Sequence, residues 1–161
     1  MYLTKHTPYG IICMRSVVMI YTELTKKAMQ LAYNAHHGAY DKGGMPYFHH
    51  PLHLAEQMTT EEEAAAALLH DVIEDTDITA EELISHGIPL CVVEAVVLLT
   101  KPLDDNYFDY VRHVAENPIA KKVKLADLMH NSDISRISDI TEADLARLKK
   151  YKKALEILMN E

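Results

Sequence analysis

The sequence contains no tryptophan, and only 7% of its 161 residues are aromatic. Glycine and proline are also scarce, at 5 and 6 residues, which excludes collagen-like and Pro/Gly-rich disordered chains. Hydrophobic residues nevertheless make up 48% of the sequence, and a chain of this length can bury a proper core. We therefore expect a compact domain with a core of Leu, Ile, Val, Ala and Met side chains.

The sequence also lacks three other features: cysteines at metal-type spacing, a positive net charge and long apolar runs. The two cysteines, Cys13 and Cys91, match no metal-type spacing and nothing signals secretion, so we expect a cytoplasmic protein. The net charge of −8 argues against nonspecific nucleic-acid binding, which needs a basic face. The apolar stretch from Ile11 to Ile20 contains Arg15 and is too short to span a membrane. An anionic substrate would need a bound cation and nearby lysines.

Residues 1–18 are predicted to be an N-terminal extension, either poorly ordered or translated from a misplaced start. Met14 and Met19 are the alternative starts. The competing interpretation is an edge strand or helix that packs on a partner subunit, which leaves a homo-oligomer open. Residues 19–161 are predicted to form one domain, since no repeat, low-complexity tract or linker divides them.

Helical periodicity recurs along the rest of the chain, whereas sustained strand alternation does not. The predicted helix starts lie at or after capping residues and prolines, namely Thr22, Thr79, Pro89, Ile119 and Thr141. In the last helix, the side chains expected to face the core are Leu145, Leu148, Leu155 and Leu158. The prediction is an all-α fold, a single helical bundle of six to eight helices.

The most informative stretch is an apolar run, residues 64–69, that ends in His70-Asp71 and, one turn later, Glu74-Asp75. An apolar helix has no structural use for four ionisable groups in six residues. Residues four apart share a helix face, so two of these groups can bind a cation while two more reach the water or substrate bound to it. The alternative is the solvated end of a helix.

Further motifs precede and follow the doublet. In chain order the full set is Ala35-His36-x-Gly38, Gly44-x-Pro46-Tyr47-x-x-His50-Pro51, Leu68-Leu69-His70-Asp71-x-x-Glu74-Asp75-Thr76 and Lys124-Leu125-Ala126-Asp127-x-x-x-Asn131. Each one alone is a weak signal, because a lone histidine on an apolar helix is more often a hydrogen-bonded core residue. Together they resemble the HD superfamily of metal-dependent phosphohydrolases. The resemblance is strongest to the hydrolase domain of Rel-type stringent-response enzymes, which remove the 3′-pyrophosphate of the alarmone ppGpp, and to small stand-alone bacterial HD proteins.

The resemblance implies that residues 19–161 are an HD phosphohydrolase domain with one divalent cation. In Rel-type enzymes this ion is Mn²⁺. The ligands implied here are His50, His70, Asp71 and Asp127. Two imidazoles and two carboxylates also suit Fe, Co, Ni or Zn.

The resemblance also implies an acid–base pair and substrate contacts. Glu74 and Asp75 are expected to orient and deprotonate the attacking water or to protonate the leaving oxygen. His36 is expected to be a buried structural histidine, and His130 is left open. The expected substrate contacts are Lys42 for a phosphate, Asn131 for the sugar, Lys124 for a phosphate or a carboxylate, and Tyr47.

One position departs from the Rel-type pattern. Those enzymes carry an Arg-Lys pair in the glycine loop, residues 38–46 here, and the arginine stacks on the guanine base. This sequence has Asp41 before Lys42, and an aspartate cannot stack on a purine in that way. Tyr40 or Tyr47 could stack instead. Weak discrimination between guanine and adenine is therefore expected.

The function predicted from these motifs is (p)ppGpp 3′-pyrophosphohydrolase. One alternative is an HD hydrolase of another phosphorylated nucleotide, such as a nucleotide monophosphate or NADPH. The other is a nucleotide-binding regulator without turnover, which the intact set of metal ligands and the intact Glu74-Asp75 pair disfavour.

Overall fold

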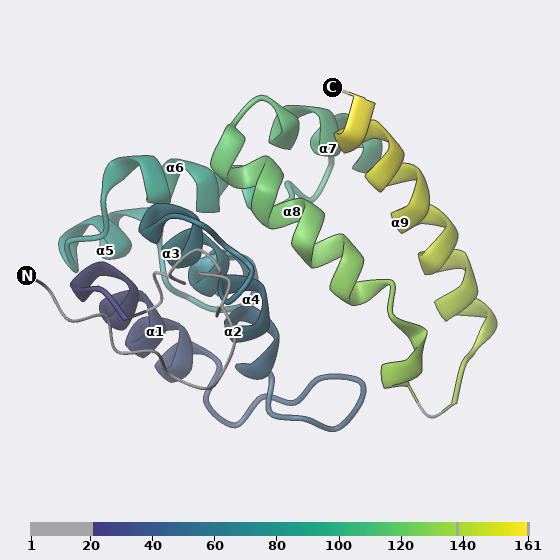
Figure 1. Ribbon diagram of the computed structural model, residues 1–161, viewed down its shortest axis with the longest axis horizontal. Coiled ribbons are helices and arrows are strands. Elements are labelled where there is room, and N and C mark those ends of the chain that lie inside the picture. Colours follow the sequence, from purple (N-terminus) through teal and green to yellow (C-terminus); the bar gives the residue numbers. More distant parts are fainter. Residues whose placement is uncertain (1–20, 138, 161) are drawn as a thin grey trace, which may run out of the picture.

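The computed structural model describes residues 21–137 and 139–160, whose regular structure is helical apart from one isolated bridge between Tyr40 and Pro46. The helices, shown in Figure 1, are α1 (Glu23–Ala35), α2 (His49–Ala55), α3 (Glu61–Leu69), α4 (Val72–Asp75), α5 (Ala80–Ser85), α6 (Leu90–Leu99), α7 (Tyr107–Ala115), α8 (Pro118–Asn131) and α9 (Glu142–Asn160), with a 3₁₀ turn η1 (Ile134–Arg136). His70 and Asp71 keep helical backbone angles, so α4 continues α3. Counted in this way, the described residues form eight helices, and the all-α prediction is confirmed.

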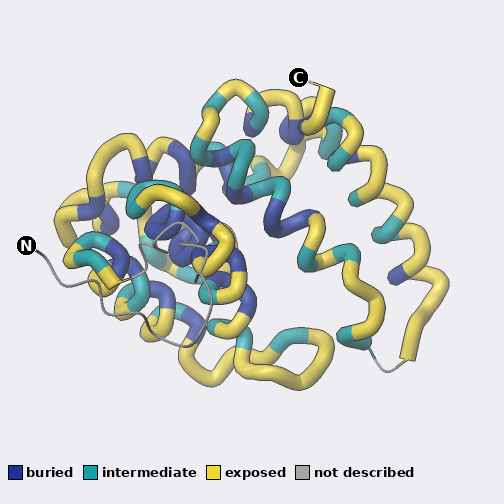
Figure 2. Tube along the Cα trace, in the orientation of Figure 1, coloured by how far each residue is buried: buried dark blue, intermediate teal, exposed yellow. Residues whose placement is uncertain are grey.

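Helix α3 is the centre of the core. Its residues 64–69 are all buried, as Figure 2 shows, and α1, α2, α6 and α8 pack around it. A helix that is apolar on every side is stable only when it is surrounded, and the alanines at positions 64–67 leave room for close neighbours. The first ionisable side chains after this run therefore lie at the edge of the core.

The helix starts follow from local capping. Thr22, Thr60 and Thr79 each form a capping box at the start of α1, α3 and α5, and such a cap contributes about 1 kcal/mol. Asn117 caps α8, which begins at Pro118, one residue earlier than expected. The prediction for the last helix is wrong at one position, because Leu145 is 47% exposed.

Helices α8 and α9 lie side by side and form the right-hand part of the molecule in Figure 1. Helix α8 packs against α3 on one side and α9 on the other. The glycine loop runs toward η1, the turn that follows α8, where a Cβ on Gly43 would lie 2.8 Å from the carbonyl oxygen of Arg136. This approach places the loop beside the segment that follows the C-terminal end of α8.

The predicted extension, residues 1–18, lies outside the described residues. Among the described helices, none is both long and apolar enough to cross a membrane.

Candidate metal centre and substrate pocket

The four side chains predicted to bind a metal come from three parts of the chain and lie close together. His50 is in the first turn of α2, Asp127 is in α8, and His70 and Asp71 join α3 to α4. His50, His70 and Asp127 are 5%, 2% and 6% exposed. Because α3 packs against both α2 and α8, the end of its apolar run brings the His-Asp doublet next to the other two residues.

The distances between these groups match neighbouring ligands of one ion. Nε2 of His50 lies 3.3 Å from Oδ1 of Asp127 and 3.9 Å from Oδ2 of Asp71. His50, His70 and Asp127 each offer a ligand atom within 4.8 Å of the others. Two atoms bound at about 2.1 Å to one cation lie about 3 Å apart when adjacent and about 4 Å when opposite. The structure thus supplies a candidate site for a divalent metal.

The chemistry of His70 also fits a cation. Its Nδ1 lies 2.8 Å from the carbonyl oxygen of Ala67, and because a carbonyl only accepts, this nitrogen carries the proton. Nε2 is buried without a hydrogen-bond partner among the described residues, although Oδ2 of Asp71 lies 2.8 Å away. A buried lone pair facing a carboxylate is costly. A cation bound by both atoms removes that cost.

The electrostatics of the cluster favour a positive charge. Burial lowers the pKa of His70, but the charges of Asp71 and Asp127 outweigh burial and raise this pKa to about 9. Burial also raises the pKa of Asp127, but Lys124 and the two imidazoles hold that pKa far below its usual range. The site therefore attracts either a proton or a metal ion.

Three residues predicted to contact substrate are hydrogen-bonded to the candidate metal carboxylates. Lys124 Nζ and Asn131 Nδ2 donate to the two oxygens of Asp127, at 2.9 and 2.5 Å. The hydroxyl of Tyr47 donates to Oδ2 of Asp71. Burial and the nearby carboxylates raise the pKa of Tyr47, so this hydroxyl keeps its proton and remains a donor. These bonds orient both carboxylates toward the imidazoles.

The predicted acid–base pair is divided between two sides of the site. Glu74 lines a cavity of about 270 Å³ together with Lys124 and Asp127, and it accepts a hydrogen bond from the backbone N–H of Lys101 at 3.2 Å. Asp75 does not line this cavity. Its pKa is raised by partial burial and by Asp71. Successive residues of a helix point about 100° apart, so one turn of α4 cannot aim both carboxylates at one point.

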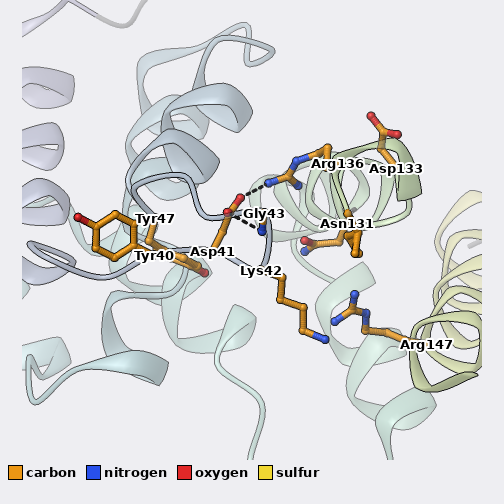
Figure 3. A pocket seen from close by; sticks show the side chains of 10 residues that line it. Tyr40, Asp41, Lys42, Gly43, Tyr47, Asn131, Asp133, Arg136 and Arg147 are labelled. Atoms are coloured by element: carbon orange, nitrogen blue, oxygen red, sulfur yellow. Dashed lines mark hydrogen bonds and ion pairs between the residues drawn. The ribbon is translucent and has the colours of Figure 1, made fainter. Parts of the chain in front are cut away.

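A second cavity, of about 240 Å³, adjoins the glycine loop (Figure 3). Lys42 extends into it from the loop and Arg147 from α9. Both contact Oδ1 of Asp144, at 3.3 and 2.9 Å. The side chain of Lys42 remains 64% exposed, so an incoming phosphate can reach it. Asn131 lines the same cavity.

Asp41 has a role that the sequence did not indicate. Its Oδ1 accepts the backbone N–H groups of Gly43 and Met45, both at 2.9 Å, and its Oδ2 lies 2.5 Å from Nη2 of Arg136. Burial raises the pKa of Asp41, but these hydrogen bonds and the guanidinium outweigh it, so the pKa is lowered. The carboxylate holds the loop in shape, and Arg136 balances its charge.

Sequence reasoning missed several cationic and aromatic residues that line the two cavities. Lys150 and Tyr151 lie three and four residues after Arg147 on α9, so the three side chains share one face. That spacing was visible in the sequence. The segment 131–136 resembles the small stand-alone HD proteins, but no spacing in the sequence indicated that Arg136 contacts the glycine loop, because Asp41 is 95 positions away.

The two motif histidines outside the ligand set are also placed. His36 is 6% exposed, as predicted, and its ring packs against that of Tyr47 with centroids 4.8 Å apart. His130 is half-buried and contacts His50 through their Nδ1 atoms, 2.7 Å apart.

Fold and site together define a class: an all-α protein with a buried His/Asp cluster suited to a divalent metal. A sequence model of the HD domain matches residues 28–153. The chain belongs to the HD-domain family, and the predicted resemblance is confirmed. The matched range includes every residue predicted for the site.

Two relatives extend the comparison. The guanosine-3′,5′-bis(diphosphate) 3′-pyrophosphohydrolase MESH1 of Danio rerio is 36% identical over 109 residues, or 60% of this chain and 59% of the relative. The guanosine-3′,5′-bis(diphosphate) 3′-pyrophosphohydrolase of Aquifex aeolicus is 34% identical over 122 residues, or 69% of this chain and 18% of the relative. The chain thus spans less than a fifth of the long relatives that it matches.

A solved structure agrees with the fold. It is that of a metazoan ortholog of SpoT, described as hydrolysing ppGpp and playing a role in starvation responses. The match has a TM-score of 0.67 at 25% identity and covers 85% of this chain and 86% of the other.

Proposed function

We propose that this chain is a metal-dependent phosphohydrolase that removes the 3′-pyrophosphate of ppGpp. The observation that carries the proposal is the convergence of His50, His70 and Asp127 beside cavities with cationic side chains. The relatives named as guanosine-3′,5′-bis(diphosphate) 3′-pyrophosphohydrolases support the choice of substrate.

The proposed cation is Mn²⁺, held by His50, His70 and Asp127 together with Asp71. The donor set of nitrogen and oxygen atoms supports this choice without excluding Fe, Co, Ni or Zn. When bound, such an ion lowers the pKa of a water molecule and screens phosphate charge.

The other residues are assigned by what they touch. Glu74 lies in the cavity that contains Asp127, so we assign it the proton transfer to or from the reacting water and leaving oxygen. Lys42 and Arg147 lie together in the neighbouring cavity and would bind phosphate oxygens, since Arg147 offers a fork that matches phosphate geometry. Asp144 holds both cations in place before substrate arrives.

Asp75 is assigned a smaller part in the proton transfer that we assign to Glu74. Its raised pKa, caused by burial and by Asp71, suits an acid that supplies a proton. It acts from the side of His36 rather than from the cavity that Glu74 lines.

One alternative substrate class has specific support. Asp41 occupies the position of the base-stacking arginine and is committed to the loop and to Arg136. The remaining contacts, Lys42 and Asn131, address phosphate and sugar. Another phosphorylated nucleotide, such as NADPH or a nucleotide monophosphate, is therefore the second candidate. A regulator without turnover has no comparable support.

The test is a substrate panel with the purified chain and Mn²⁺. The panel contains ppGpp, NADPH and nucleotide monophosphates, with release of phosphate and pyrophosphate measured separately. We expect pyrophosphate from ppGpp and no release by the Asp127→Asn variant. Phosphate release from NADPH alone, with ppGpp untouched, would replace the first candidate by the second.

Further expectations on domain bounds, location and partners belong to the same proposal. Residues 19–161 form the HD domain, and residues 1–18 are an extension to it. A cytoplasmic location suits the two cysteines without metal-type spacing, of which Cys91 is a free, exposed thiol. Self-association stays open, and size-exclusion chromatography with light scattering tests it. No nucleic-acid or membrane partner is proposed.

A further inference from the structure

A chain of four side chains links the glycine loop to a candidate metal ligand. It begins with Asp41, whose carboxylate holds Nη2 of Arg136 at 2.5 Å. Nη1 of the same guanidinium lies 3.1 Å from Nδ1 of His130. That Nδ1 lies 2.7 Å from Nδ1 of His50. The opposite nitrogen of His50, Nε2, faces Asp127 at 3.3 Å.

The contact between the two imidazoles has the geometry of a hydrogen bond within the ring planes. The planes of His50 and His130 are inclined by 15°, and their centroids are 4.8 Å apart. An imidazole N–H lies in the plane of its ring, so nearly coplanar rings let one Nδ1 donate directly to the other. One of the two nitrogens must carry the proton and the other must not.

Arg136 determines which nitrogen carries it. A guanidinium is positively charged and only donates hydrogen bonds. Nη1 of Arg136 lies 3.1 Å from Nδ1 of His130 and 3.5 Å from the carbonyl oxygen of the same residue, so a lone pair on this Nδ1 is favoured over an N–H and His130 is the acceptor. The proton between the rings then belongs to Nδ1 of His50. We propose that Arg136 and His130 are positioning residues that hold His50 in the tautomer protonated on Nδ1 and thereby keep its Nε2 free for a divalent cation. This inference rests on the metal site of the proposed function.

The second imidazole of the site shows why such a device is needed. His70 donates from Nδ1 to the carbonyl of Ala67, which can only accept and so fixes the tautomer by itself. His50 has a histidine in the place of that carbonyl, and a neutral imidazole can donate or accept. The guanidinium of Arg136 decides which of the two rings carries the proton. Asp41 orients this guanidinium, so the glycine loop is coupled to a metal ligand.

The first test measures the affinity of the full chain for Mn²⁺ alone, by competition with a chelating dye. His130→Phe keeps a ring but removes the acceptor, and we expect its Kd for Mn²⁺ to rise about 10–100-fold, the usual effect of losing such a partner of a ligand. His130→Asn offers a carbonyl oxygen near the same place, and its Kd should stay within about threefold of the unmodified chain.

A matched control comes from the same cluster. His53 packs against His130 with ring centroids 4.6 Å apart, but among the described residues its ring forms no hydrogen bond with Arg136 or His50. His53→Phe should therefore leave the Kd unchanged. Thermal unfolding in excess chelator detects variants that merely lose their fold. A Kd for His130→Phe equal to that of the unmodified chain overturns the inference.

The second test observes the tautomer directly. Nitrogen-15 NMR of the imidazole rings, on the chain loaded with diamagnetic Zn²⁺, should show His50 protonated on Nδ1 with the metal on Nε2. In Arg136→Met, the proton should be shared between His50 and His130. A proton on Nε2 of His50 in the unmodified chain contradicts the proposal. Neither readout uses substrate. If the chain binds Mn²⁺ but leaves ppGpp intact, the proposed function is wrong, while the inference on His50 still holds.

Discussion

His50 and Asp127 lie 3.3 Å apart across the contact between α2 and α8, with Nε2 of one facing Oδ1 of the other. Neither residue belongs to the His-Asp doublet, yet both lie against it. This contact closes the candidate metal site, because it brings a nitrogen and an oxygen from two helices that both pack on α3 to one point. Variants at the site and in its glycine loop give four predictions, and Glu63, in the first turn of α3, gives a fifth.

Asp127→Asn should lose the metal. The amide keeps the size of the side chain but removes the negative charge that attracts the cation, and it leaves Lys124 without a counter-charge. Metal analysis after dialysis against chelator and reloading with Mn²⁺ should find one ion per unmodified chain and background in the variant. Asp109→Asn, at an exposed ion pair on α7, is the control. Stoichiometric Mn²⁺ in Asp127→Asn would mean that the metal lies elsewhere.

Glu74→Gln should bind Mn²⁺ normally but lose at least about 10²-fold in turnover, the usual scale for losing a general acid or base. The reason is its position in the cavity beside Asp127, outside the cluster of candidate ligands. Asp75→Asn should lose less, because Asp75 does not line that cavity. Steady-state kinetics of both variants, with metal content measured in parallel, decides the order. Equal losses would show that both carboxylates act on the reaction.

Lys124→Met should destabilise the metal-free chain by about 3–5 kcal/mol, since it leaves the buried carboxylate of Asp127 without its ammonium partner. Mn²⁺ should restore much of the loss, because the cation takes over the compensation of that charge. Urea unfolding with and without Mn²⁺ measures both effects. A loss that is the same in both conditions would indicate that the metal does not bind Asp127.

Asp41→Arg should weaken ppGpp handling. From the sequence alone the same change is expected to lower KM by restoring the stacking arginine. The structure predicts a higher KM, because the change removes the acceptor of two loop N–H groups and sets a second cation against Arg136. Asp41→Asn keeps one acceptor and should show a smaller rise. A lower KM for Asp41→Arg would mean that stacking outweighs the shape of the loop.

Glu63 should contribute stability that depends on pH. Burial raises its pKa, but hydrogen bonds from Lys122 and Thr59 outweigh burial and lower it. A depressed pKa means that the contribution is present above the unfolded-state pKa, near 4.3, and is lost as the pH falls through the folded-state value. Glu63→Gln should therefore unfold more easily than the unmodified chain at pH 7, by about 1 kcal/mol, with the difference vanishing in acid. A difference that is independent of pH would exclude this ionic origin.

Local chemistry explains how much of the fold the sequence predicts. A capping box such as Thr79 with Glu82 involves residues three positions apart, so its hydrogen bonds form wherever the segment lies. The apolar run of α3 must likewise be buried in any compact arrangement. Helix starts, the all-α class and the edge-of-core position of His70 and Asp71 all follow from such short-range rules.

For the candidate site too, some features were predicted from the sequence and others depend on the tertiary structure. The sequence identified the residue types that bind a cation, and their order along the chain matched a family. It could not place Arg136 on Asp41, which is 95 positions away, or separate Glu74 from Asp75. These relationships depend on how α8 and α9 pack and on where the glycine loop ends. Such long-range contacts are decided by the sum of core packing over the whole chain, and no local pattern encodes them.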